Sequence, residues 1–160
     1  MPRRAWLLAA LLALALAPAA PQAADPDPVA LAAIKKMGLG SNLATLSYRL
    51  AQETPTYQKL VEALGVQKAR LLVRDEVTRL AAKYQEQWDR NLALAYTEFM
   101  LPRELQSLAE TGPSSPAFAK FTQKQAEVNR SMEAKSAGLM KDLAWEALTS
   151  ATAQAGTQKK

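Results

Sequence analysis

The chain has 160 residues, with 20 lysines and arginines against 15 aspartates and glutamates, a formal net charge of +5, and neither histidine nor cysteine. The lack of these two residue types excludes Ser-His and Cys-His nucleophiles, thiolate metal sites, disulfides and a lipid-modified cysteine. Basic and acidic residues alternate and no basic stripe with aromatics occurs, so we expect no nucleic-acid binding.

The first 24 residues have the pattern of a secretory signal peptide of bacterial type. Arg3 and Arg4 form a positive start, and residues 6–17 are an unbroken run of 12 apolar residues. Small residues and prolines follow this run, as at a cleavage site. A bilayer span needs about 20 residues. The segment therefore predicts export rather than a membrane anchor.

The cleavage position has three candidates, after Ala19, Ala23 or Ala24, and Ala24 is favoured because Asp25 begins the polar sequence. Cleavage there leaves 18 basic against 15 acidic residues, a net charge of +3. We expect a periplasmic or secreted protein that is not a lipoprotein and has no stable membrane insertion after cleavage.

The first half of the remaining chain predicts three short helices. Asp27-Pro28 and Thr54-Pro55 each place a capping side chain before a proline of the first turn. Gly38 and Gly65 are expected to end the first and third helices, and Gly38 and Gly40 can adopt the left-handed conformation that closes a helix. The second helix is indicated by leucines at helical spacing, namely Leu43, Leu46 and Leu50.

Two long helices are predicted in the second half. The first covers residues 66–101, with apolar residues at steps of three and four and no glycine or proline. Pro102 starts a short helix that reaches Glu110. A Gly/Pro/Ser-rich loop over 111–116 precedes the second long helix, 116–150.

These elements predict an all-α fold, a single compact bundle of five to six helices with the two long ones antiparallel. The signal peptide would occupy residues 1–24 and the helical domain residues 25–150. The basic tail, residues 151–160, is small and polar and is expected to be disordered.

The stretch from Leu92 to Phe121 resembles a family of secreted bacterial helical domains of unknown function. The resemblance rests on two aromatic residues at a helix end, a Glu-Leu pair, and a Ser-Pro turn followed by a lysine, which are here Tyr96, Phe99, Glu104, Leu105, Ser115, Pro116 and Lys120. Thr111-Gly112-Pro113 stands where that family has an aromatic pair. The resemblance implies an exported helical protein but no reaction, and Glu104 and Ser115 are expected to stabilise helix starts.

Two carboxylate pairs are the candidates for acid–base chemistry. Asp75 and Glu76 are adjacent on a helix and point about 100° apart, so we expect a solvated, ion-paired face beside Arg74 and Arg79. The carboxylates of Glu98 and Glu104 would have to meet across the turn at Pro102. No Asp-rich loop accompanies them, and we expect neither a metal nor a cofactor.

Aromatic residues are the best candidates for a ligand pocket. Five of them, from both long helices, are expected to line a cavity between helices, namely Tyr84, Trp88, Tyr96, Phe99 and Phe121. The alternative is that they, like Trp145 and the other tyrosines, belong to the bundle core. The leading hypothesis is a non-enzymatic protein that binds a protein partner or client in the cell envelope. The alternative is a carrier of a small apolar ligand, and an enzyme built on carboxylates alone is the third hypothesis.

Overall fold

The computed structural model describes residues 25–157, which contain seven α-helices, one short 3₁₀ turn and no strand. The all-α class is confirmed for this part of the chain, and the predicted number of five to six helices is wrong. The predicted signal peptide lies outside the described residues. The helices are α1 (Pro28–Met37), α2 (Leu43–Gln52), α3 (Pro55–Leu64), α4 (Val66–Thr97), α5 (Pro102–Thr111), α6 (Phe118–Gln123) and α7 (Gln125–Thr157), with the turn η1 (Gly112–Ser114).

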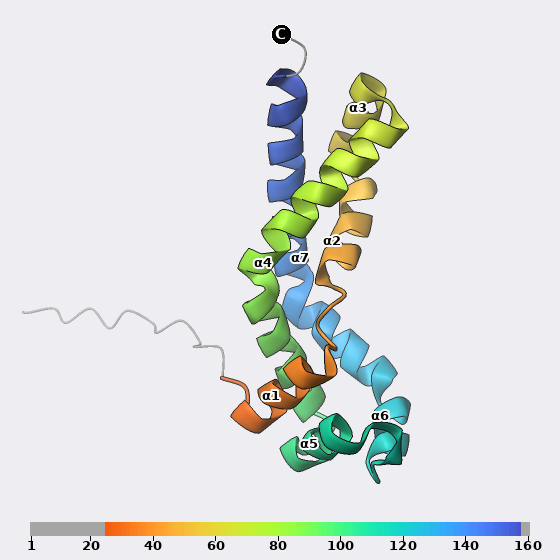
Figure 1. Ribbon diagram of the computed structural model, residues 1–160, viewed down its shortest axis with the longest axis vertical. Coiled ribbons are helices and arrows are strands. Elements are labelled where there is room, and N and C mark those ends of the chain that lie inside the picture. The colour runs from red at the N-terminus through yellow and green to blue at the C-terminus, as the bar shows by residue number, and fades with distance from the viewer. Residues whose placement is uncertain (1–24, 158–160) are drawn as a thin grey trace, which may run out of the picture.

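The two long helices, α4 of 32 residues and α7 of 33, run in opposite directions and form the axis of the molecule (Figure 1). The short helices α1 and α5 pack together at one end, and α2 and α3 lie along the other half (Figure 1). Buried apolar side chains from α1 to α5 and α7 form one hydrophobic cluster. This cluster supplies the main driving force for packing the helices.

Local capping explains where the short helices begin and end. Asp27 Oδ1 accepts hydrogen bonds from the backbone N–H groups of Val29 and Ala30, and Thr54 Oγ1 accepts one from Tyr57. Gly38 and Gly65 end α1 and α3 with φ of 64° and 80°, a region that glycine adopts without strain. These four predicted boundaries are confirmed.

The predicted helix over 116–150 is two helices. Ser115 Oγ accepts from the N–H of Ala117, so the chain turns there and α6 begins at Phe118. At Lys124 the backbone has ψ of 1°, and α7 begins at the next residue. This change of direction lets Phe121 stack on Tyr96 of α4, with ring centroids 5.6 Å apart. Tertiary packing thus divides a segment that local propensity reads as continuous.

The expected disorder of residues 151–160 is wrong up to Thr157, because α7 continues to that residue. Ala151 and Ala155 are buried, and Gln154 Nε2 donates to Glu76 Oε1 on α4 at 2.8 Å. Small side chains that suggest a polar tail in the sequence therefore pack closely against neighbouring helices. The predicted helical domain of 25–150 extends accordingly, while 158–160 lie outside the described residues.

Within residues 25–157, no helix combines the length and the apolar character that crossing a membrane requires.

Candidate ligand-binding groove

A buried amide fixes the relative position of α4 and α7. Asn91 Nδ2 donates to the carbonyl oxygen of Lys135 at 3.0 Å and to Ser136 Oγ at 2.9 Å. Its Oδ1 accepts from Gln87 Nε2 at 2.8 Å. Buried polar groups strongly favour an arrangement in which they are paired, so these bonds select one register of the two helices.

A second polar link lies toward the other end of the helix pair. Glu76 is buried, with its carboxylate 2.5 Å from Arg79 and 2.8 Å from Gln154 of α7. The hydrogen bond from Arg79 is the largest cause that lowers the pKa of Glu76 to about 2. The expectation of a solvated acidic pair is therefore wrong for Glu76, whereas Asp75 is exposed and pairs with Arg74.

Between these two helices and the start of α2, the surface is hollowed into a groove of about 370 Å³. Its apolar floor comes from three helices and consists of Leu46, Trp88, Leu92, Tyr96, Met132 and Met140. Its rim carries polar side chains, among them Asn42, Asn129 and Glu133. An apolar, partly aromatic floor with a few polar groups at its edge is typical of a site for a small molecule, for which volumes of about 300–1,000 Å³ are common.

Trp88 is the most informative residue of the groove. Its side chain is only 2% exposed, and its indole N–H has no hydrogen-bond acceptor among residues 25–157. A buried donor without an acceptor costs about 1–3 kcal/mol.

Tyr96 forms a fixed end wall of the groove. Its hydroxyl and the side-chain amide of Gln125 lie within hydrogen-bond distance, at 3.2 and 3.3 Å. The ring of Phe121 stacks on a face of the Tyr96 ring, with an interplanar angle of 5°. Burial raises the pKa of Tyr96, so its hydroxyl stays protonated and neutral. The wall can therefore offer a polar contact without adding charge.

The groove contains two of the five aromatic residues predicted from the sequence, Trp88 and Tyr96. Phe121 supports Tyr96 without lining the groove, and Phe99 follows the end of α4. Tyr84 lies beside Lys83, whose Nζ is 5.2 Å from the ring centroid. The other three predicted members do not line this groove.

The remaining walls could not be found from the aromatic pattern. Leu46 lies on α2, and Met132 and Met140 lie on α7. Each of them is at least 40 residues along the chain from Leu92 of α4. Asn42 precedes α2 but makes no capping hydrogen bond with its side chain. Asn at this position normally caps, so the sequence alone would assign Asn42 to the helix start rather than to the groove.

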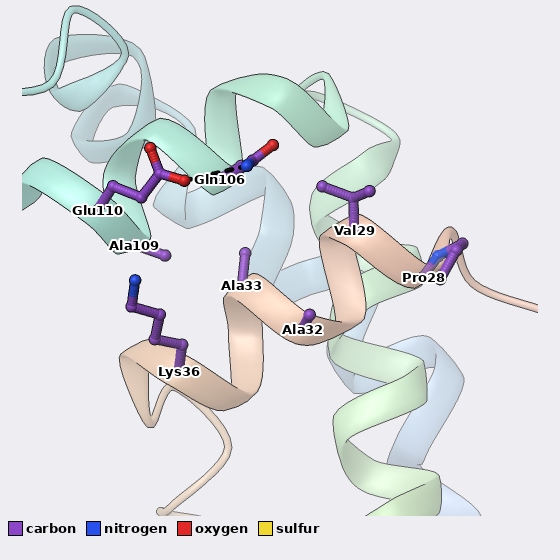
Figure 2. Close-up of a pocket in the computed structure, with 8 residues that line it drawn as sticks. All are labelled: Pro28, Val29, Ala32, Ala33, Lys36, Gln106, Ala109 and Glu110. Carbon is purple, nitrogen blue, oxygen red and sulfur yellow. Dashed lines mark hydrogen bonds between the residues drawn. The ribbon is translucent and has the colours of Figure 1, made fainter.

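A second groove, of about 410 Å³, lies along the surface where α1 and α5 pack together. Figure 2 shows Val29 and Ala33 on α1 facing α5, where Gln106 donates to Glu110 at 3.0 Å. Small apolar side chains line it together with Lys36, Gln106 and Glu110, and no buried aromatic residue contributes to it. The α2–α4–α7 groove is therefore the stronger candidate among the described residues.

The residues of the family-like signature have structural roles in the corner formed by α5 and α6. Glu104 accepts from the N–H of Leu101 at 2.8 Å and from Lys120 Nζ at 2.7 Å. Ser115 Oγ lies 2.8 Å from Ser107 Oγ, and Leu105 is fully buried. Pro116 lies in the turn directly before α6. These five residues of the resemblance therefore close the corner, whereas Tyr96, which also belongs to it, lines the groove.

The two carboxylates that could have met across the Pro102 turn are each held by a lysine. Glu98 pairs with Lys135 at 2.6 Å, while Glu104 pairs with Lys120. These lysines lower the pKa of both glutamates, so each remains ionised. No group of three or more acidic residues suited to a metal ion occurs in residues 25–157. The arrangement gives no support to acid–base chemistry.

No protein-family model, curated protein or solved structure matches the chain.

Proposed function

We propose that the protein is an exported, non-enzymatic binding protein whose α2–α4–α7 groove takes a small, largely apolar ligand. The observation that carries this proposal is the apolar floor of the groove, which three helices build around the indole of Trp88. The ligand would cover Leu46, Leu92 and Met132 with an apolar body and meet the polar side chains of the rim with its polar end. The N-terminal pattern and the resemblance of residues 92–121 to secreted domains support the cell envelope as its location.

A fluorescence titration tests the groove directly. Of the three tryptophans, Trp6 lies in the proposed signal peptide, so in a chain that begins at Asp25 the variant Trp145→Phe keeps Trp88 as its single tryptophan. The probe is 1-anilinonaphthalene-8-sulfonate, which has apolar rings and a sulfonate that accepts hydrogen bonds. We expect saturable binding at one site per chain, seen as quenching of Trp88 emission and energy transfer to the probe.

Two matched variants decide where the probe binds. Asn129→Phe replaces an exposed amide on the rim with a ring that fills the groove, and it should weaken binding by about tenfold or more, about 1.4 kcal/mol. Gln123→Phe makes the same change at an exposed position of α6 that does not line the groove, and it should leave binding unchanged. Equal binding by both variants would contradict the proposal, as would a probe that never saturates.

Export is tested by the mass of the protein recovered from the envelope fraction of its host. A chain that begins at Asp25 is expected. A chain retaining residues 1–24 would contradict removal of a signal peptide.

Binding of a protein partner is the second candidate function. It is favoured by large apolar side chains exposed on the surface, among them Val66, Leu71 and Trp145. If this function is the main one, the groove probe should not bind, and the protein should be recovered from the envelope fraction with another polypeptide.

A further inference from the structure

Polar and apolar side chains form two separate rows on the α7 wall of the groove. Gln125, Asn129 and Glu133 follow one another at steps of four positions, so they lie on one side of the helix, about 6 Å apart along its axis. Met132 is rotated by about 100° from Glu133 and belongs to the floor. The rim of the groove therefore runs from an amide at Gln125 to a carboxylate at Glu133.

Glu133 is the only charged residue among the described residues that line the groove. Its side chain is exposed and has no ion-pair partner in the described part of the chain. Two cationic residues lie close to it in the sequence but do not neutralise it. Arg130 is rotated by about 60° from Glu133 in the direction away from Met132, and Lys135 pairs with Glu98 at 2.6 Å. The groove thus combines an apolar floor with one negative charge at its rim.

The uncharged part of the rim can accept hydrogen bonds from the same ligand group. Asn42 lines the groove from the start of α2, and its side chain makes no capping hydrogen bond. The amide oxygens of Asn42 and Asn129 can each accept, and the carboxylate of Glu133 only accepts. A protonated primary amine matches this set because it carries both a positive charge and N–H donors, whereas a quaternary ammonium group carries the charge alone.

We propose that the ligand of the α2–α4–α7 groove is an amphiphile with a primary ammonium head. Its apolar body covers the floor, and its head pairs with Glu133 and donates to the amides of the rim. This inference rests on the proposed function of the groove. The bound body displaces water from the floor beside the ion pair, and Coulomb attraction grows as the local dielectric constant falls. The preference for a cation therefore depends on the charge of Glu133.

Competition between probes that differ only in their head group tests this proposal, on protein purified from its own host. The reporter is N-phenyl-1-naphthylamine, an uncharged probe with apolar rings whose fluorescence rises in apolar sites. The competitors are octylammonium, octyltrimethylammonium, octanol and octanoate, which share one apolar chain. Octylammonium should displace the reporter at a concentration at least about threefold lower than octanol, as expected for a partly exposed ion pair. Octyltrimethylammonium should be weaker than octylammonium because it has no N–H donor, and octanoate should be the weakest.

Variants of Glu133 show whether its charge sets this order. Glu133→Gln keeps a side chain of similar size without the charge, so octylammonium and octanol should compete equally. Glu133→Lys reverses the charge and should make octanoate the strongest competitor. Glu133 is exposed and unpaired, so both variants should keep the fold, and unchanged binding of the uncharged reporter will show that the groove is intact.

Asp142→Asn is the matched control for the loss of one negative charge. Asp142 is exposed, does not line the groove and lies nine positions from Glu133, about 180° around α7. Trp145, three positions further along, is 68% exposed, so the expectation that it lies in a pocket or in the core is wrong, and this side of α7 faces solvent. The control variant should show the same order of competitors as wild type.

The reporter separates the failure of this inference from the failure of the proposed function. If the reporter binds wild type and Asn129→Phe excludes it, equal strength of the four competitors would overturn the ammonium head and leave the groove as a binding site. A preference for octylammonium that persists in Glu133→Gln, or that disappears in Asp142→Asn, would also overturn the inference. A reporter that does not bind wild type would contradict the proposed function and this inference with it.

Discussion

The side-chain amide of Asn91 on α4 donates to the hydroxyl of Ser136 on α7 at 2.9 Å, and both residues are buried. This contact joins the two long helices one residue from Leu92, which forms part of the groove floor. The same amide also binds the backbone of Lys135. The helix pair and the candidate groove therefore depend on a common polar anchor.

Asn91→Ala should lower the free energy of unfolding by about 1–3 kcal/mol, because it leaves the buried Ser136 hydroxyl without this partner. Urea denaturation measures the change. Asn129→Ala removes an amide from an exposed position of α7 and should change stability by less than about 0.5 kcal/mol. Equal losses in the two variants would show that Asn91 is not an anchor.

Glu76 should make stability fall in acid. Its pKa in the folded protein is about 2, below the ordinary value of 4.5, so its carboxylate is stabilised by folding. This contribution is fully present above pH 4.5 and is lost as the pH falls from 4.5 toward 2, and it amounts to about 2–3 kcal/mol. Glu76→Gln should flatten the dependence of unfolding free energy on pH in this window. Asp75→Asn, at the exposed neighbour, should leave it as in wild type, and an identical effect of the two variants would exclude Glu76 as the cause.

Gly40 is required by its contact with Asp89. A Cβ at this position would lie 2.0 Å from Asp89 Oδ1, and the carbonyl oxygen of Gly40 already accepts from Gln85 at 2.9 Å. Asp89 is buried, so its side chain has little room to move. Gly40→Ala should therefore destabilise the fold by about 1–3 kcal/mol, as overpacking does.

A double-variant cycle checks this cause. Asp89→Ala removes the clashing oxygen, so Gly40→Ala should cost much less in that background, with a coupling of at least about 0.5 kcal/mol. Additive losses would mean that Gly40 matters for another reason.

Glu104 should stabilise the corner between α5 and α6 rather than act in catalysis. Glu104→Ala removes both the bond to the N–H of Leu101 and the ion pair with Lys120, and about 1 kcal/mol of stability should be lost. Glu110→Ala is the matched change at the exposed end of the same helix and should have a smaller effect. Thermal unfolding distinguishes them, and a Glu104 variant as stable as wild type would contradict this role.

The sequence predicts best what local chemistry determines. The starts at Asp27-Pro28 and Thr54-Pro55 depend on side chains that bond to the adjacent backbone, and they are found where expected. The break at Lys124 and the buried end of α7 depend on contacts with distant helices, so local pattern could not reveal them.

The candidate site shows the same division. Apolar periodicity along α4 places Trp88 and Tyr96 on the inner face of the helix, where they line the groove. The opposite walls come from Leu46 and Met132, which the fold brings together from other helices. Buried polar residues such as Asn91 are also missed, because periodicity assigns polar side chains to the solvent.

Native mass spectrometry of the protein purified gently from its own host shows whether the α2–α4–α7 groove carries a ligand. We predict chains that carry a small molecule, an extra mass of roughly a few hundred daltons, because a groove of this size suits a ligand of that size. The extra mass should be absent or much reduced in Asn129→Phe and retained in Gln123→Phe. Bare wild-type chains, or an extra mass that both variants retain equally, would contradict binding of a small ligand in the α2–α4–α7 groove.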